Sequence, residues 1–124
     1  MAEEGQVIVC GSQEEVTLNL DKGQKEHKLV MIFFTASWCG PCRFVAPGVA
    51  ELANMYPNVR FLKVDVDDLP DVARAWNVRA MPTFTFLKNG EKVDEVVGAT
   101  KVALEDAIEK YSEGLGGTTS TSAI

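Results

Sequence analysis

The sequence predicts a single α/β domain with a mixed central β-sheet and helices on both faces of that sheet. Between residues 7 and 113, short apolar runs of strand length alternate with longer amphipathic segments of helical period. Leu29–Phe34 is apolar at every position, which is typical of a central parallel strand covered by helices on both sides. Asn89 and Gly90 separate two further strand-like runs and favour a type I′ hairpin turn.

Local signals set the boundaries of these elements. Ser12 and Glu15 have the spacing of a capping box, which predicts a helix that begins at Gln13, runs to about residue 20 and ends before Gly23. Pro47 lies inside the next helix, where it removes one hydrogen bond and is expected to kink the helix. The expected order is β-α-β-α-β-α-β-β-α, with strands at 7–10, 29–34, 59–66, 83–87 and 92–97, and helices at 13–20, from the cysteine motif to 55 or 56, near 70–76, and at 101–112.

Length and charge limit the classes of function. The 124 residues can bury one well-filled core, and 18 acidic against 12 basic residues give a net charge of −6. With no basic stripe, we expect no binding to nucleic acid or to an anionic membrane. No apolar run reaches the roughly 18 residues of a membrane span, and the acidic segment 1–5 resembles neither a secretory signal nor a transit peptide. We therefore expect a cytoplasmic protein, with a domain over 1–113 and a flexible Gly/Ser/Thr-rich tail over 114–124.

The Cys39-Gly40-Pro41-Cys42 motif stands where the central strand gives way to a helix. A cysteine at a helix N-terminus meets free backbone N–H groups and the positive end of the helix dipole, and both stabilise a thiolate. We therefore expect Cys39 to attack a substrate disulfide and Cys42 to resolve the mixed disulfide. Gly40 would let a partner backbone approach, and Pro41 would stiffen the loop. The alternative interpretation of the two cysteines is half of a zinc site. Zinc normally takes four ligands, and no second pair of soft ligands in the sequence has the required spacing, so no metal is expected.

Four motifs follow one another along the chain: Trp38–Cys42, Phe61–Asp67, Ala80–Phe84 and Val97–Ala99. Together and in this order they resemble thioredoxin over residues 7 to about 113. Phe34–Ser37 before the cysteines and Val9-Cys10 near the start are similar to the plant cytosolic h-type in particular. The resemblance implies the thioredoxin fold and a protein disulfide reductase without a bound cofactor. It also implies that electrons come from a separate NADPH-dependent thioredoxin reductase.

The resemblance further implies a shallow substrate-binding surface beside the cysteines. Pro82 is expected to follow a cis peptide bond and to lie against the cysteines, and the Met81 backbone is expected to pair with an extended substrate. For Pro82 taken alone, an ordinary turn is the alternative. The other members of this surface are expected to be Trp38, Pro41, Val97, Gly98 and Ala99.

Phe33 departs from the family pattern, which places a buried acid at this position. In the family, that acid is thought to take the proton from the resolving cysteine, and phenylalanine cannot carry a proton. Cys42 would then give its proton to water, to a substrate group or to another carboxylate. We therefore expect slower turnover than in a typical member, together with higher stability, because an apolar ring replaces a buried carboxylate.

The third cysteine, Cys10, lies near the end of the first strand. One interpretation is a small, partly buried apolar residue, and the other is a site of redox modification by an intermolecular disulfide or a glutathione adduct. We expect a monomer that acts on disulfide-containing client proteins, with a Cys10-linked dimer as the alternative under oxidation. A redox-impaired binding module or holdase is the alternative function and is favoured by Phe33, whereas Gly-Pro between the cysteines disfavours an oxidant or isomerase.

Overall fold

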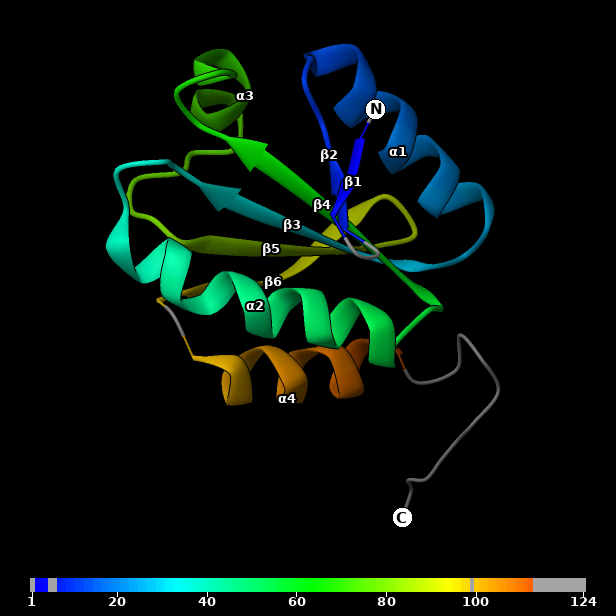
Figure 1. Ribbon diagram of the computed structural model, residues 1–124. Helices are drawn as coiled ribbons and strands as arrows, with labels where there is room; N and C mark the ends of the chain where they lie inside the picture. The colour runs from blue at the N-terminus through cyan, green and yellow to red at the C-terminus, as the bar shows by residue number, and fades with distance from the viewer. Residues whose placement is uncertain (1, 5–6, 99, 113–124) are drawn as a thin grey trace.

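The computed structural model describes residues 2–4, 7–98 and 100–112, and within them six strands form one mixed sheet (Figure 1). The predicted tail over 114–124, the predicted boundary at 113 and Ala99 lie outside the described residues. The strands are β1 (Ala2–Glu4), β2 (Val7–Val9), β3 (Leu29–Thr35), β4 (Val59–Asp65), β5 (Thr83–Lys88) and β6 (Glu91–Val97). The helices are α1 (Gln13–Lys25), α2 (Gly40–Met55), α3 (Pro70–Ala75) and α4 (Lys101–Ser112).

The strands lie in the order β1-β2-β4-β3-β5-β6. β4 is parallel to both of its neighbours, β2 and β3, whereas the other three pairs are antiparallel. The mixed sheet and the expected order of strands and helices are therefore confirmed, with one strand added at the N-terminus. β1 was not predicted because a three-residue edge strand is held by its backbone pairing with β2, which leaves no periodic pattern in so short a segment.

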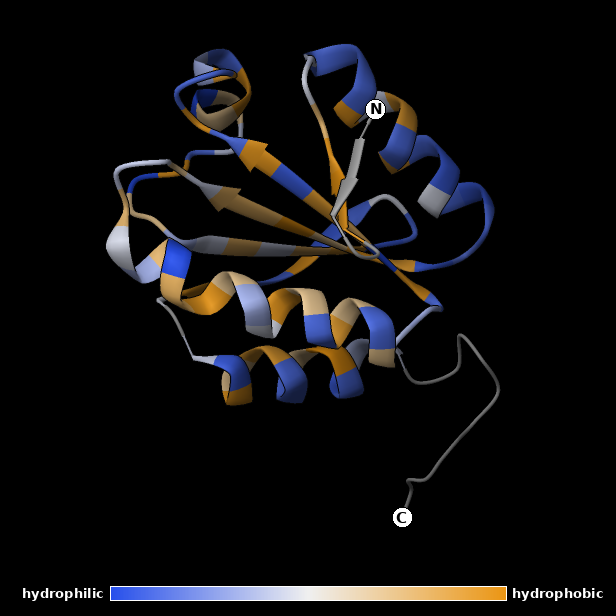
Figure 2. Ribbon diagram, viewed as in Figure 1, coloured by the Kyte–Doolittle hydropathy of each residue, from blue (hydrophilic) through white to orange (hydrophobic). Residues whose placement is uncertain are grey.

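Helices α2 and α4 cover one face of the sheet, and α1 and α3 cover the other (Figure 1). The central strand β3 is buried at all seven positions, as its apolar sequence predicts. Its side chains alternate between two core clusters, and hydropathy colouring shows the central strands as largely hydrophobic (Figure 2). Leu29, Met31 and Phe33 belong to the cluster under α2 and α4, and Val30, Ile32 and Phe34 belong to the cluster under α1 and α3.

Helix α1 begins as predicted, since the Ser12 side chain accepts a hydrogen bond from the Glu15 N–H at 3.2 Å. The Glu15 carboxylate completes the cap differently from a capping box, because it accepts from the Gly11 N–H at 2.7 Å. The predicted end of this helix is wrong, since the helix continues through Gly23 to Lys25. Gly23 is needed for packing: a Cβ there would lie 2.4 Å from Cγ2 of Val30 on β3.

The true end of α1 is a Schellman motif built without glycine. His27 has a φ of 56°, which places it in the left-handed region. The His27 N–H donates to the Gln24 carbonyl oxygen at 3.1 Å, and the Lys28 N–H donates to the Gly23 carbonyl oxygen at 2.9 Å. These two bonds satisfy carbonyl groups that would otherwise lack partners at the helix end.

The other predicted elements are close to those observed. Asn89 and Gly90 have φ values of 55° and 83°, which confirms a turn with two left-handed residues between β5 and β6. α2 runs without interruption through Pro47, and the kink there stays a prediction. α3 and α4 lie within one residue of their expected positions.

We predict that Gly23→Ala destabilises the fold. Overpacking costs about 1–3 kcal/mol, which exceeds the roughly 0.5–1 kcal/mol that alanine contributes in a helix interior. The free energy of unfolding, measured by urea denaturation, should therefore fall by about 1 kcal/mol. Gly48→Ala is the matched control, because its added Cβ would meet only the flexible Lys101 side chain, at 3.4 Å. Equal effects of the two substitutions would contradict the packing role of Gly23.

Candidate functional site

Cys39 and Cys42 are joined by a disulfide at the N-terminus of α2. Cys39 is the N-cap residue, and its Sγ accepts a hydrogen bond from the Cys42 N–H at 3.2 Å. The Arg43 N–H donates to the Cys39 carbonyl oxygen at 3.2 Å, and this is the first bond of the helix. The sulfur of Cys39 therefore occupies the place where helices prefer the side-chain oxygen of Ser or Asp. A negative charge on Cys39 would be stabilised there by backbone N–H groups and by the helix dipole.

The two cysteines are largely covered, with 4% of Cys39 and 1% of Cys42 exposed. The neighbouring residues are open to solvent. Trp38 is 63% exposed, Pro41 is exposed, and a Cβ added to Gly40 would meet no atom within 4 Å. The surface at Gly40 is therefore open, and no side chain covers this position.

Trp38 is held in place by Asp67, a contact that our sequence analysis missed. The indole Nε1 donates to the Asp67 carboxylate at 2.8 Å. Asp67 lies two residues after the end of β4. β4 is parallel to β3, so the carboxyl ends of the two strands meet at one edge of the sheet. The parallel pairing was the available signal, because it brings the loop after β4 beside the loop that carries the cysteines.

The loop that carries Met81 and Pro82 contacts the loop that follows β6. The Met81–Pro82 peptide bond is cis, as the family resemblance implied. Met81 packs against the core cluster that contains both cysteines. The Gly98 N–H donates to the Pro82 carbonyl oxygen at 3.1 Å, and Gly98 has a φ of 118°, which favours glycine. Val97, which is 58% exposed, pairs with Thr83 in the register of β5 and β6.

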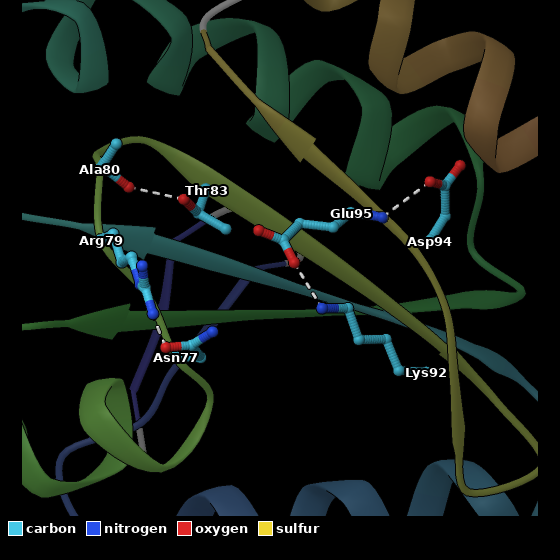
Figure 3. A network of polar contacts seen from close by, with 7 residues as sticks. All are labelled: Asn77, Arg79, Ala80, Thr83, Lys92, Asp94 and Glu95. Atoms are coloured by element: carbon cyan, nitrogen blue, oxygen red, sulfur yellow. Dashed lines mark hydrogen bonds and ion pairs between the residues drawn. The ribbon is translucent and has the colours of Figure 1, made fainter.

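The loop before Met81 begins at a second Schellman motif, at the end of α3. Asn77 has a φ of 58°, and the Asn77 and Val78 N–H groups donate to the Arg74 and Ala73 carbonyl oxygens. The Asn77 side-chain oxygen accepts from Arg79 Nε at 3.2 Å, and Thr83 Oγ1 donates to the Ala80 carbonyl oxygen (Figure 3). Side-chain contacts therefore brace both ends of the segment that leads to Pro82.

Phe33 is 1% exposed and belongs to the same core cluster as Cys42. Its ring stacks on Phe84, with centroids 4.9 Å apart and planes inclined by 17°. Phe33 is also the register partner of Lys63 on β4. Both residues border a cavity of about 30 Å³, whose lining consists of Val7, Phe33, Ala46, Val49, Ala50 and Lys63.

Cys10 is buried, with 3% exposed, on the face of the sheet opposite the two other cysteines. Burial, together with the nearby Glu15 carboxylate, raises the pKa of its thiol to about 11. A covered thiol that resists ionisation favours the apolar interpretation over redox modification.

The described residues hold no group of three or more His, Cys, Asp or Glu side chains that could bind a metal ion. In the same residues, no helix is both long and apolar enough to cross a membrane.

Comparison with known proteins identifies close relatives. The thioredoxin family model matches residues 12–110. A "Thioredoxin H-type" of Ricinus communis is 56% identical over 110 residues, which cover 89% of this chain and 93% of the relative. "Thioredoxin H1" of Arabidopsis thaliana is 54% identical and covers 89% and 96%. The crystal structure of thioredoxin NaTrxh from Nicotiana alata superposes with a TM-score of 0.83 at 40% identity and covers 90% and 96%.

We predict that Cys10 reacts slowly in the folded protein. In the oxidised chain, Cys10 is the only free thiol, so iodoacetamide labelling followed by mass spectrometry reports on it alone. Because its pKa rises from 9.0 to about 11, the thiolate fraction at pH 8 falls by about 100-fold, and labelling should slow at least as much relative to the unfolded, still oxidised chain. The labelling rate should keep rising between pH 9 and pH 11. Equal rates in the two states would instead support a reactive Cys10.

Proposed function

The chain belongs to the thioredoxin family of thiol-disulfide oxidoreductases, and from this premise we propose that Cys39 is its attacking thiolate and Cys42 its resolving thiol. The protein is a dithiol-disulfide reductase, and the Cys39–Cys42 pair stands at the active-site position. The observation that carries the assignment of roles is the hydrogen bond from the Cys42 N–H to Cys39 Sγ. Only Cys39 is the N-cap, where the helix terminus stabilises a negative charge.

The proposed reaction transfers two electrons from the dithiol to a client disulfide. The Cys39 thiolate attacks one client sulfur, the client S–S bond breaks, and the other client sulfur leaves as a thiolate that takes up a proton. Cys42 then loses its proton and attacks Cys39 Sγ. The bond between Cys39 and the client sulfur breaks, that client sulfur leaves as a thiolate and takes up a proton, and the Cys39–Cys42 disulfide remains, which is the state that the structure holds.

Further proposals concern the partners. Thioredoxins act on disulfide-containing targets and are reduced by a partner enzyme. For this chain we propose an NADPH-dependent thioredoxin reductase as the electron source, a monomeric state and a cytoplasmic location. The similarity to plant H-type thioredoxins supports these assignments.

The client is proposed to bind as an extended segment along the Met81 backbone, with Pro82 beneath it. Support comes from the cis bond, from the bond between Gly98 and Pro82, and from the open surface at Gly40. The surrounding contacts would be Trp38, Gly40, Pro41, Val97, Gly98 and Ala99.

Trapping experiments test the assignment of the two thiols. We expect Cys42→Ser to accumulate mixed disulfides with clients through Cys39, because attack still occurs but resolution does not. Cys39→Ser is the matched control and should form none, since the buried Cys42 lacks the N-cap position. Non-reducing gels of the variants with oxidised insulin, followed by mass spectrometry of the adducts, measure both outcomes. Equal trapping by the two variants would refute the proposed roles.

Phe33 is proposed to slow the resolving step while stabilising the fold. The buried ring and its stack on Phe84 make large apolar contacts, but a phenylalanine ring cannot accept the proton of Cys42. Replacing a buried Phe by a small residue costs about 3–5 kcal/mol. An acid at this position would therefore gain a proton acceptor at the expense of stability.

We expect Phe33→Asp to resolve mixed disulfides several-fold faster than Phe33→Asn at neutral pH, because only Asp can accept a proton. Asn has the same shape as Asp, so both variants should lose about 3 kcal/mol or more of unfolding free energy. Single-turnover quenching of a preformed mixed disulfide gives the rate, and urea denaturation gives the stability. In the unaltered protein, the resolving rate should rise with pH because hydroxide and water take the proton. A rate independent of pH, or equal rates in Asp and Asn variants, would contradict this role of Phe33.

A further inference from the structure

Two arginine side chains stand at the edge of the site and take no part in the exchange reaction. Arg43 lies in the first turn of α2, directly after Cys42, and its Nη1 donates to the Ser37 carbonyl oxygen. That bond folds the guanidinium back over the loop that leads into Cys39. Arg79 lies two residues before Met81, and its Nε donates to the Asn77 side-chain oxygen (Figure 3). Both side chains are exposed.

The charges of these two residues have no carboxylate partner within the described part of the chain. Their hydrogen bonds go to neutral oxygen atoms, a carbonyl for Arg43 and an amide for Arg79. The other two arginines differ in this respect, since Arg60 pairs with Glu26 and Arg74 pairs with Asp71. The protein as a whole is acidic, with a net charge of −6. The two guanidinium groups without carboxylate partners therefore place positive charge locally, at the edge of the site.

The hydrogen bonds also leave donor groups available. Arg79 uses Nε, so its two terminal nitrogen atoms can bind both oxygens of one carboxylate. Arg43 uses Nη1 and retains Nε and Nη2 as donors. Because each side chain is already held at one nitrogen, less conformational entropy is lost when a carboxylate binds than for a freely rotating lysine.

We propose that Arg43 and Arg79 select client segments that carry a carboxylate within a few residues of the reactive cysteine. An extended chain advances about 3.3 Å per residue, so a carboxylate one to three residues from a cysteine bound at Cys39 falls within reach of a long arginine side chain. Arg43 would take a carboxylate on the α2 side, and Arg79 one on the side of the Met81 loop. This inference rests on the proposed attack by Cys39.

The expected preference is modest and local. Asp67 and Asp68 are exposed at the same edge of the sheet, so the region as a whole does not attract anions over a long range. Contacts between exposed ions are worth little, and a preference of about twofold to fivefold is the size to expect. Raised salt should abolish it because the charges are open to solvent.

The test uses pairs of short disulfide-bonded peptides that differ only by Glu or Gln, placed one to three residues from the cysteine. We expect kcat/KM for reduction to be about twofold to fivefold higher for the best Glu peptide at low salt, and equal for the pair in about 0.5 M salt. Arg43→Gln combined with Arg79→Gln should bring the ratio to about one, while Arg→Lys at both positions should keep part of it. Lys22→Gln combined with Lys25→Gln is the control of equal charge change, since both lysines are exposed in the last turn of α1. The end of α1 lies far from the start of α2 (Figure 1).

The outcomes separate this inference from the function on which it rests. A ratio near one in the unaltered protein, or a ratio unaffected by the double Gln variant, would overturn the selection by Arg43 and Arg79. A drop of the same size in the variant with both Lys22→Gln and Lys25→Gln would also overturn it, because the effect would then follow net charge alone. If the Gln peptides are not reduced at all, the proposed attack at Cys39 fails instead.

Discussion

The burial of β3 on both faces is the constraint on which the rest of this molecule depends. Because every side chain of Leu29–Thr35 is covered, each face of the strand requires its own helical layer, and the two core clusters follow from the alternation of its side chains. The strand must also be paired on both edges, which β4 and β5 provide. Its carboxyl end is the first place where the chain can leave the core, and Cys39 stands there, at the start of α2.

The site is thus assembled from loops that the sheet brings to one edge. Parallel pairing with β4 delivers Asp67 to Trp38, and antiparallel pairing with β5 delivers Pro82. The register of β5 and β6 then places Gly98 where its N–H can reach the Pro82 carbonyl oxygen. None of these loops is long, and each is held at a strand end or helix end by backbone hydrogen bonds. Such fixed backbone groups suit the binding of extended clients proposed above, because ordering them during binding would cost entropy.

The sequence predicted the elements whose signals are periodic or local, and it failed where tertiary contacts decide. The apolar run of β3, the strands that follow it, the start of α2 and the turn at Asn89 were all predicted correctly. The end of α1 was misplaced because Gly23 was interpreted as a helix stop, whereas it provides the close approach to Val30. The stop itself uses His27 in a left-handed conformation, where glycine or asparagine is the usual signal.

For the candidate site too, the sequence predicted the features that have local signals and missed those that depend on tertiary contacts. The cysteine motif and the family resemblance identified the chemistry and the surrounding loops, because those residues are recognisable as types at fixed spacing. The bond between Trp38 and Asp67 joins residues that are 29 positions apart and depends on strand order, which no local pattern reveals. The neutral hydrogen-bond partners of Arg43 and Arg79 likewise became visible only in three dimensions.

The stack of Phe33 on Phe84 has a consequence for proton linkage. A carboxyl group buried between β3 and α2 would be neutral at low pH and charged at high pH, and burial would raise its pKa. The folded state would then hold that proton more tightly than the unfolded state, and stability would decline as the pH rose through the range between the two pKa values. A phenylalanine ring has no proton to release. At this position the interior keeps the same charge at every pH, so the stability of the fold and the protonation events of disulfide exchange are uncoupled there.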